Sequence, residues 1–295
     1  MSGSDEGKIR RWQVEDGKEV GTLMDAGSSV NNIAVSQDGK WIVSGTYAGE
    51  LAVWDAQSQK KVTGWKEYGN DWVKAVDISP DGERIATGGY KQTVCVWSLS
   101  TGQQLLGPLK HEDMVVAVKF SPDGRLIATG AWHCNSVRVY DSQSGDLLVD
   151  VPIRVAALVW VGNRKKLFAL SDKGKINHLD VSTGTTVSSW SIHSSKDPFC
   201  IALASNGKFI AASAGSSVSF WDTTTHKRIG SIIKHTNDIK SMAISANYDL
   251  VTGGHEAITL WNIRDVLPSS YYEDVSVIAS NARCMGFVPN DKLLC

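Results

Sequence analysis

The sequence lacks the segments that direct a protein to a secretory or membrane compartment. Residues 1–8 contain no apolar stretch, and no run of 18 apolar residues occurs anywhere in the chain, so we expect neither a signal peptide nor a membrane-spanning helix. The 5 cysteines are an odd number without Cys-x-x-Cys spacing, which argues against a disulfide framework and against a zinc site. We therefore expect a soluble protein of a reducing compartment, the cytoplasm or the nucleus.

An excess of charge of one sign is also missing. The chain has 30 Lys and Arg residues against 31 Asp and Glu residues, which gives a formal net charge of -1. A chain this close to neutrality has no global attraction to phosphate backbones or anionic lipid. We therefore expect neither a nucleic-acid partner nor a membrane partner.

The sequence patterns of common catalytic sites do not occur. Gly-x-Ser-x-Gly, Gly-x-Gly-x-x-Gly and Gly-x-x-x-x-Gly-Lys-[Ser/Thr] are absent, which disfavours a nucleophile elbow, a dinucleotide loop and a phosphate loop. The 7 histidines are dispersed without His-x-x-x-His spacing, and too few metal ligands lie close together in the sequence. We expect no cofactor, no metal and no catalytic residues.

What the chain does contain is a repeat. A short apolar motif recurs seven times at steps of 42, 43, 43, 39, 42 and 40 residues, anchored at Trp12, Trp54, Trp97, Tyr140, Leu179, Trp221 and Trp261. A fixed period near 40 is typical of an array of small supersecondary units. The period favours seven copies of one unit over two unrelated domains.

Each unit reads as four short strands. In the copy at 71–105, apolar residues at 73, 76 and 78 predict a first strand, and Ser79-Pro-Asp-Gly82 predicts a turn, because Pro presets φ and Gly accepts positive φ. Residues 84–89, 93–97 and 104–106 predict three further strands. Repeated without helical periodicity between them, such units predict an all-β, seven-bladed β-propeller of four-stranded antiparallel blades.

The Trp-Asp pairs, the Ser-Pro-Asp-Gly turns and the small-residue segments around Thr46, Thr87, Thr129 and Thr252 make the chain resemble the WD-repeat family of β-propellers over almost its whole length. Its turns are also similar to those of propellers at the C-terminal end of large fungal proteins with nucleotide-binding domains. The resemblance implies one domain over residues 1–295. Because residues 1–23 begin halfway through a unit and residues 281–295 supply only a first half, we expect strands from both termini to share one blade and close the ring.

The family often holds each blade with a hydrogen-bonded set: His before the first strand, Ser or Thr on the second, Asp in the next turn and Trp on the third. This chain departs from that pattern. Only His111 and His235 clearly occupy the histidine position, and Ala48 and Lys91 stand at the turn position of the Asp. We therefore expect apolar packing and sheet hydrogen bonds to stabilise the ring more than this network does.

The resemblance also implies where a partner binds. Propellers of this family commonly bind partners on the face formed by the loops before the first strands and between the second and third strands. The turn positions place eight residues on that rim: Tyr47, Trp72, Tyr90, Met114, Trp132, His133, Arg154 and Asp238. Large aromatic side chains and Arg dominate binding hot spots. We therefore expect a non-catalytic scaffold for a protein or peptide partner, acting as a monomer or as a component of a larger complex.

Two alternatives stay open. Tyr and Trp also stack on sugar rings, which makes a lectin-like propeller the first alternative. A lectin propeller tends to repeat one residue set in every blade, whereas here successive turns carry Tyr-Ala, Tyr-Lys, Trp-His and Asp-Lys; this irregularity favours one asymmetric partner. An enzyme with a site at the channel mouth is the lesser alternative, because the residues expected there include a single carboxylate, Asp238.

Overall fold

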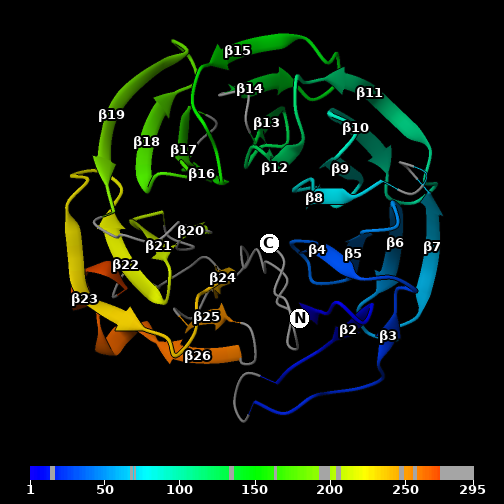
Figure 1. The fold of residues 1–295 in the computed structure, drawn as a ribbon, viewed down its shortest axis with the longest axis horizontal. Coiled ribbons are helices and arrows are strands. Elements are labelled where there is room, and N and C mark those ends of the chain that lie inside the picture. The colour runs from blue at the N-terminus through cyan, green and yellow to red at the C-terminus, as the bar shows by residue number, and fades with distance from the viewer. Residues whose placement is uncertain are drawn as a thin grey trace.

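The computed structural model describes residues 1–13, 17–66, 69, 71–132, 136–162, 165–192, 200–203, 207–245, 249–254 and 258–272. The described strands form seven antiparallel sheets in a ring. The first strand of each four-stranded sheet lies nearest the centre and the fourth lies on the circumference (Figure 1). The predicted all-β, seven-bladed propeller is thus confirmed.

The blades follow one another in chain order. The first three sheets comprise β1 (Ser2–Gly3), β2 (Lys8–Arg10) and β3 (Met24–Asp25); β4 (Val30–Val35), β5 (Trp41–Thr46), β6 (Glu50–Asp55) and β7 (Lys61–Lys66); and β8 (Val73–Ile78), β9 (Arg84–Gly89), β10 (Thr93–Ser98) and β11 (Gln104–Lys110). The next two comprise β12 (Val115–Phe120), β13 (Leu126–Ala131), β14 (Ser136–Asp141) and β15 (Leu147–Val151); and β16 (Ala157–Val161), β17 (Lys166–Leu170), β18 (Lys175–Asp180) and β19 (Thr185–Ser191). The last two comprise β20 (Ile201–Leu203), β21 (Phe209–Ala214), β22 (Ser217–Asp222) and β23 (Arg228–Lys234); and β24 (Ser241–Ile244), β25 (Asp249–Gly253) and β26 (Ile258–Asn262), which two 3₁₀ turns follow, η1 (Ile263–Asp265) and η2 (Ser269–Tyr271).

The unit used to predict the strands is reproduced closely. Strands β8, β9 and β10 have the expected bounds to within one residue, and β11 continues to Lys110 instead of ending at 106. The predicted turn closes with the Gly82 amide donating to the Ser79 carbonyl at 2.8 Å. Local turn chemistry therefore sets where the first strand ends.

The N-terminal segment supplies β1, β2 and β3, so its share of the first sheet reaches Asp25, two residues beyond the predicted 1–23. Residues 281–295, which we expect to complete that blade, lie outside the described residues. The blade shared by both termini, and with it the single-domain boundary at 295, stays a prediction.

A register shift marks the repeat anchor in four consecutive blades. The pairing of the third strand with the fourth shifts next to the anchor residue, between Val53 and Trp54, Val96 and Trp97, Val139 and Tyr140, and His178 and Leu179. Such bulges increase the local twist of a strand. The unit with Leu in place of Trp therefore keeps the same backbone geometry as its neighbours.

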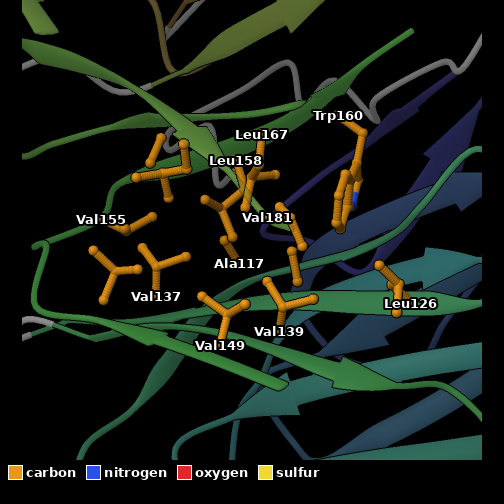
Figure 2. Packing of buried hydrophobic residues seen from close by; sticks show 14 residues of the cluster. Ala117, Leu126, Val137, Val139, Val149, Val155, Leu158, Trp160, Leu167 and Val181 are labelled. Atoms are coloured by element: carbon orange, nitrogen blue, oxygen red, sulfur yellow. The ribbon is translucent and has the colours of Figure 1, made fainter. Parts of the chain in front are cut away.

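The hydrophobic core lies largely between neighbouring blades. In one cluster, Val137, Val139 and Val149 of one blade pack against Leu158 and Trp160 of the next (Figure 2). The Trp160 indole Nε1 also donates to the carbonyl of residue 119 in the preceding blade, at 3.0 Å. Burying an aromatic side chain in this way stabilises the contact of the two sheets.

A glycine on the second strand makes room for a valine of the next blade. A Cβ on the glycine would lie 2.5 to 2.8 Å from the valine Cγ1 in four pairs: Gly3 with Val30, Gly45 with Val73, Gly88 with Val115, and Gly130 with Val155. Carbon atoms in ordinary contact are about 3.5 to 4.0 Å apart. The small residues that recur on the second strand therefore set how closely adjacent blades approach.

The hydrogen-bonded set of the resembling family is present in reduced form. The indole Nε1 of an anchor Trp donates to Ser or Thr on the second strand at 2.7 to 3.0 Å in four blades: Trp12 to Ser2, Trp54 to Ser44, Trp97 to Thr87 and Trp261 to Thr252. In the blade that has Tyr140 at the anchor, His111 Nε2 lies 3.1 Å from Thr129 Oγ1 and 3.5 Å from the Tyr140 hydroxyl. The indole groups and the Nε2 atom of His111 thereby find polar partners inside the blade, whereas His111 Nδ1 is buried without one.

Candidate binding surface

One backbone hydrogen bond recurs on one face of three adjacent blades. The amides of Tyr47, Tyr90 and Trp132, in the turns between second and third strands, donate to the carbonyls of the residues before the first strands. The acceptors are Ser29, Trp72 and Met114, at 2.9, 3.0 and 2.9 Å. Because the bond is the same in each blade, these residues lie on a common face, which we call the rim.

Three aromatic side chains of the rim are linked by two ring contacts. Trp72 lies between the other two, with its ring centroid 4.7 Å from that of Tyr47 and 5.7 Å from that of Tyr90. Trp72 is 40% exposed and Tyr90 is 56% exposed, whereas Tyr47 is half-buried. We call Tyr47, Trp72 and Tyr90 the aromatic triad; it joins two blades and presents ring surface to solvent.

Two glycines allow the backbone path that holds the triad. A Cβ at Gly89 would collide with the Trp72 carbonyl oxygen, the acceptor of the Tyr90 amide. Gly49 has φ of +76°, and a Cβ there would lie 2.7 Å from the carbonyl oxygen of Asp71. Only glycine tolerates both the close approach and the positive φ. The segment before β8 therefore packs directly onto the β5–β6 turn, and the ring contacts form before any partner binds.

Carboxylates border the triad. Asp5 accepts a hydrogen bond from the Ser29 hydroxyl at 3.0 Å. Burial, together with the negative charge of Asp5, raises the pKa of Tyr47 above its ordinary value. Asp71 precedes Trp72 and lies 3.9 Å from the Lys91 ammonium, both side chains being more than two-fifths exposed. The surroundings of the exposed rings are therefore more negative than the nearly neutral chain as a whole.

The other predicted residues lie elsewhere on the rim or outside the described residues. Trp132 is 41% exposed and Met114 is half-buried, both in the β12–β15 blade. Arg154, one blade further, forms a 2.8 Å ion pair with Asp172, and Asp238 lies before β24. His133 lies outside the described residues. Of the eight predicted residues, the structure therefore brings the aromatic rings of three into contact and joins Trp132 to Met114 by a backbone hydrogen bond.

Two carboxylates on this face were not among the eight predicted residues. Asp5 lies in the turn between β1 and β2, and Asp172 lies in the turn between β17 and β18. Both turns correspond to those that carry Tyr47 and Tyr90 in other blades. The Asp-Lys turn of the sequence already contained Asp172, and extending the same turn position to the first unit would have found Asp5.

A separate hollow of about 900 Å³, including its open mouth, runs along the inner strands. Its lining includes residues 32–35, 75–78, 116–119 and 156–158, and reaches Gln37 and Pro80. Those last two residues belong to turns between first and second strands, so the hollow extends toward the face opposite the rim. Within it, Lys119 Nζ lies 3.0 Å from Asp77 Oδ1, and Asp77 Oδ2 accepts from the residue 120 amide at 2.8 Å. The Asp77 carboxylate therefore joins its own strand to the inner strand of the next blade.

In the ranges that the structure describes, no group of three or more His, Cys, Asp or Glu residues is placed to hold a metal ion. No helix in the same ranges is long and apolar enough to cross a membrane. Cys95 and Cys200 are thiols and are buried in the core.

Comparison with known proteins agrees with the repeat. The family model WD40, described as WD domain, G-beta repeat, matches residues 17–55, 59–98, 103–141 and 184–222, which together make up more than half of the chain. Each matched range ends one residue after an anchor of the repeat. A search of curated proteins found no match. The coverage by the family model and the seven-bladed ring show that this chain belongs to the WD40 repeat family.

Proposed function

We propose that the chain is a non-catalytic interaction scaffold that binds a peptide or protein segment on the rim. WD40 propellers typically mediate protein interactions and are in general non-catalytic. The observation that carries the proposal is the aromatic triad, a preformed patch of exposed rings that spans two blades. Exposed aromatic surface on a folded domain usually marks an interaction site, and a site formed before binding costs little ordering entropy.

The rim is chemically irregular, which favours one asymmetric partner over a repeated sugar unit. Three adjacent blades present Tyr47, the Trp72–Tyr90 pair and the Met114–Trp132 pair at corresponding positions, and the next blade presents an ion pair. A ligand that contacts several blades therefore meets different chemistry at each step. An elongated peptide has that variety, and a repeated glycan does not.

A comparative pull-down tests the proposal. Wild type and the Trp72→Ala/Trp132→Ala variant are used as baits in extracts of cells that express the chain, and retained proteins and glycans are identified. Val187→Ala on β19 is the matched control, since its side chain is 57% exposed on the circumference. We expect proteins retained by wild type and by the control to be lost with the double variant, and the melting temperature of that variant to stay close to that of wild type.

Two results would contradict the proposal. Retention of the same proteins by the double variant would move the binding site off the rim. Retention of glycoconjugates in place of proteins would favour the lectin-like alternative.

The compartment, cytoplasm or nucleus, is a separate prediction that imaging of a fluorescent fusion tests.

A further inference from the structure

The aromatic triad and its carboxylates together define the kind of side chain that fits the rim. Trp72 and Tyr90 expose ring surface, and aromatic faces carry negative potential that attracts cations. Carboxylates on the same surface add to that attraction. The geometry points to a basic peptide segment as the partner, with an Arg or Lys side chain seated against the triad; this inference rests on the proposed function.

The charges come from two blades. The turn at 4–7 contributes Asp5 and Glu6, of which Glu6 is exposed, and the segment before β8 contributes Asp71. Among the described residues, the Lys91 ammonium lies 3.9 Å from one of these carboxylates, that of Asp71. Lys74, at the start of β8, donates to the side chain of residue 31 at 3.3 Å, so its charge is held toward the inner strands.

The Asp71–Lys91 pair shows what the site favours. Its 3.9 Å separation and its exposure make it a weak, screened contact. A peptide guanidinium can therefore compete with Lys91 for Asp71 while it stacks on the Trp72 or Tyr90 ring. Arg is suited to this double contact, because its planar group stacks on aromatic faces and donates to carboxylates. A neutral or acidic side chain at the same place would gain neither attraction.

The first test is selection from a random peptide library displayed on phage, with wild-type protein as the bait. Trp72→Ala and Tyr90→Ala are used separately for counter-selection, so that a folding defect in one variant does not decide the outcome; circular dichroism and melting temperature establish folding. We expect peptides that depend on the triad to be enriched in Arg and Lys. Triad-dependent peptides without basic residues would overturn the inference and leave the proposed function intact. Absence of triad-dependent peptides would overturn both.

The second test measures the charge directly. The tightest selected peptide is compared with its Arg-to-citrulline analogue, which keeps the shape and removes the charge, by fluorescence anisotropy at low and high salt. We expect the analogue to bind about two- to fivefold more weakly at low salt, and the difference to shrink as salt screens the carboxylates. Equal affinities at low salt would overturn the inference.

Two substitutions of opposite sign complete the design. Asp71→Asn removes the carboxylate and should weaken binding of the basic peptide, whereas Lys91→Gln removes the competing ammonium and should strengthen it, each by up to about fivefold. Both side chains are exposed, so neither change should alter the melting temperature. A merely structural role for the pair would weaken binding in both variants, which would contradict the inference.

Discussion

Replacement of Gly88 by Ala tests the spacing of the blades. A Cβ at this position would lie 2.5 Å from Val115 Cγ1 and 2.9 Å from Val118 Cγ2, both on the inner strand of the next blade. Ordinary carbon contacts are about 3.5 to 4.0 Å long, so the overlap is about 1 Å. Val115 is fully buried and β-branched, hence stiff at χ1. The two sheets must therefore move apart.

The expected cost follows from measured overpacking. Extra methyl groups in well-packed cores destabilise by about 1 to 3 kcal/mol. In large single domains each kcal/mol lowers the melting temperature by about 2 to 4 °C, so Gly88→Ala should melt about 2 to 12 °C below wild type. The glycine contributes no positive φ here, so the loss reports packing and not backbone strain.

A double-mutant cycle identifies the contact. Val115→Ala removes the nearest methyl group and should destabilise by about 2 kcal/mol alone, from the lost burial of two carbon atoms. The Gly88→Ala/Val115→Ala protein should be more stable than the sum of the single effects, by about 1 kcal/mol or more. Gly82→Ala is the control. A Cβ there has nothing within 4 Å, so any destabilisation comes from its φ of +75° and not from packing. Its effect should therefore add to that of Val115→Ala. Additive effects at positions 88 and 115 would refute the packing argument.

Two further predictions concern buried polar groups. Burial lowers the pKa of His111 to about 4 and also lowers the pKa values of His178 and His226. The neutral rings therefore contribute to the free energy of unfolding above pH 6.5, and this contribution is lost as the pH falls toward about 4. His111 accounts for about 3 kcal/mol of it. Melting curves should show that His111→Gln loses less stability than wild type across this window, and an equally steep loss in both proteins would contradict the assignment. In the inner hollow, Asp77→Ala should lower the free energy of unfolding by about 2 to 4 kcal/mol. It removes the carboxylate that accepts hydrogen bonds from the Phe120 amide and from Lys119 Nζ. Asp77→Asn keeps an acceptor oxygen and should cost less; equal urea midpoints for the two variants would count against this reasoning.

The number of blades and the strands within them could be predicted from the sequence, because both depend on local chemistry that recurs. The Asp after the anchor is one example. Asp55 and Asp141 accept hydrogen bonds from backbone amides two or three residues ahead, and so close the turn between the third and fourth strands. The hydrogen bonds from the Ser58 hydroxyl and amide lower the pKa of Asp55, and the amide bonds from residues 144 and 143 lower the pKa of Asp141. A motif used as a marker of the repeat is thus also the cause of a turn.

Contacts between blades could not be predicted in the same way. The pattern of one strand shows which residues face inward, but not which residue of the next blade they meet. Trp160 lies on a first strand, but its place in one core cluster with Val139 and its bond to the preceding blade follow only from the arrangement of both sheets. Likewise, the turn positions placed Tyr47 and Trp72 on one face, but their contact depends on the close approach at Gly49.

The backbone geometry repeats from blade to blade, whereas the side chains on the rim differ from blade to blade. Three adjacent blades share the hydrogen bond from the second-to-third turn to the residue before the first strand, while the rim changes from the aromatic triad to the Arg154–Asp172 ion pair within two blades. Strand pairing and blade spacing do not depend on these turn side chains, so each can vary without disturbing the sheets. On the proposed function, a partner that spans several blades would therefore be recognised in one direction and one register. The triad would hold its basic residue and the blades beyond would contact the residues that follow, which an elongated peptide satisfies and a compact symmetric ligand does not.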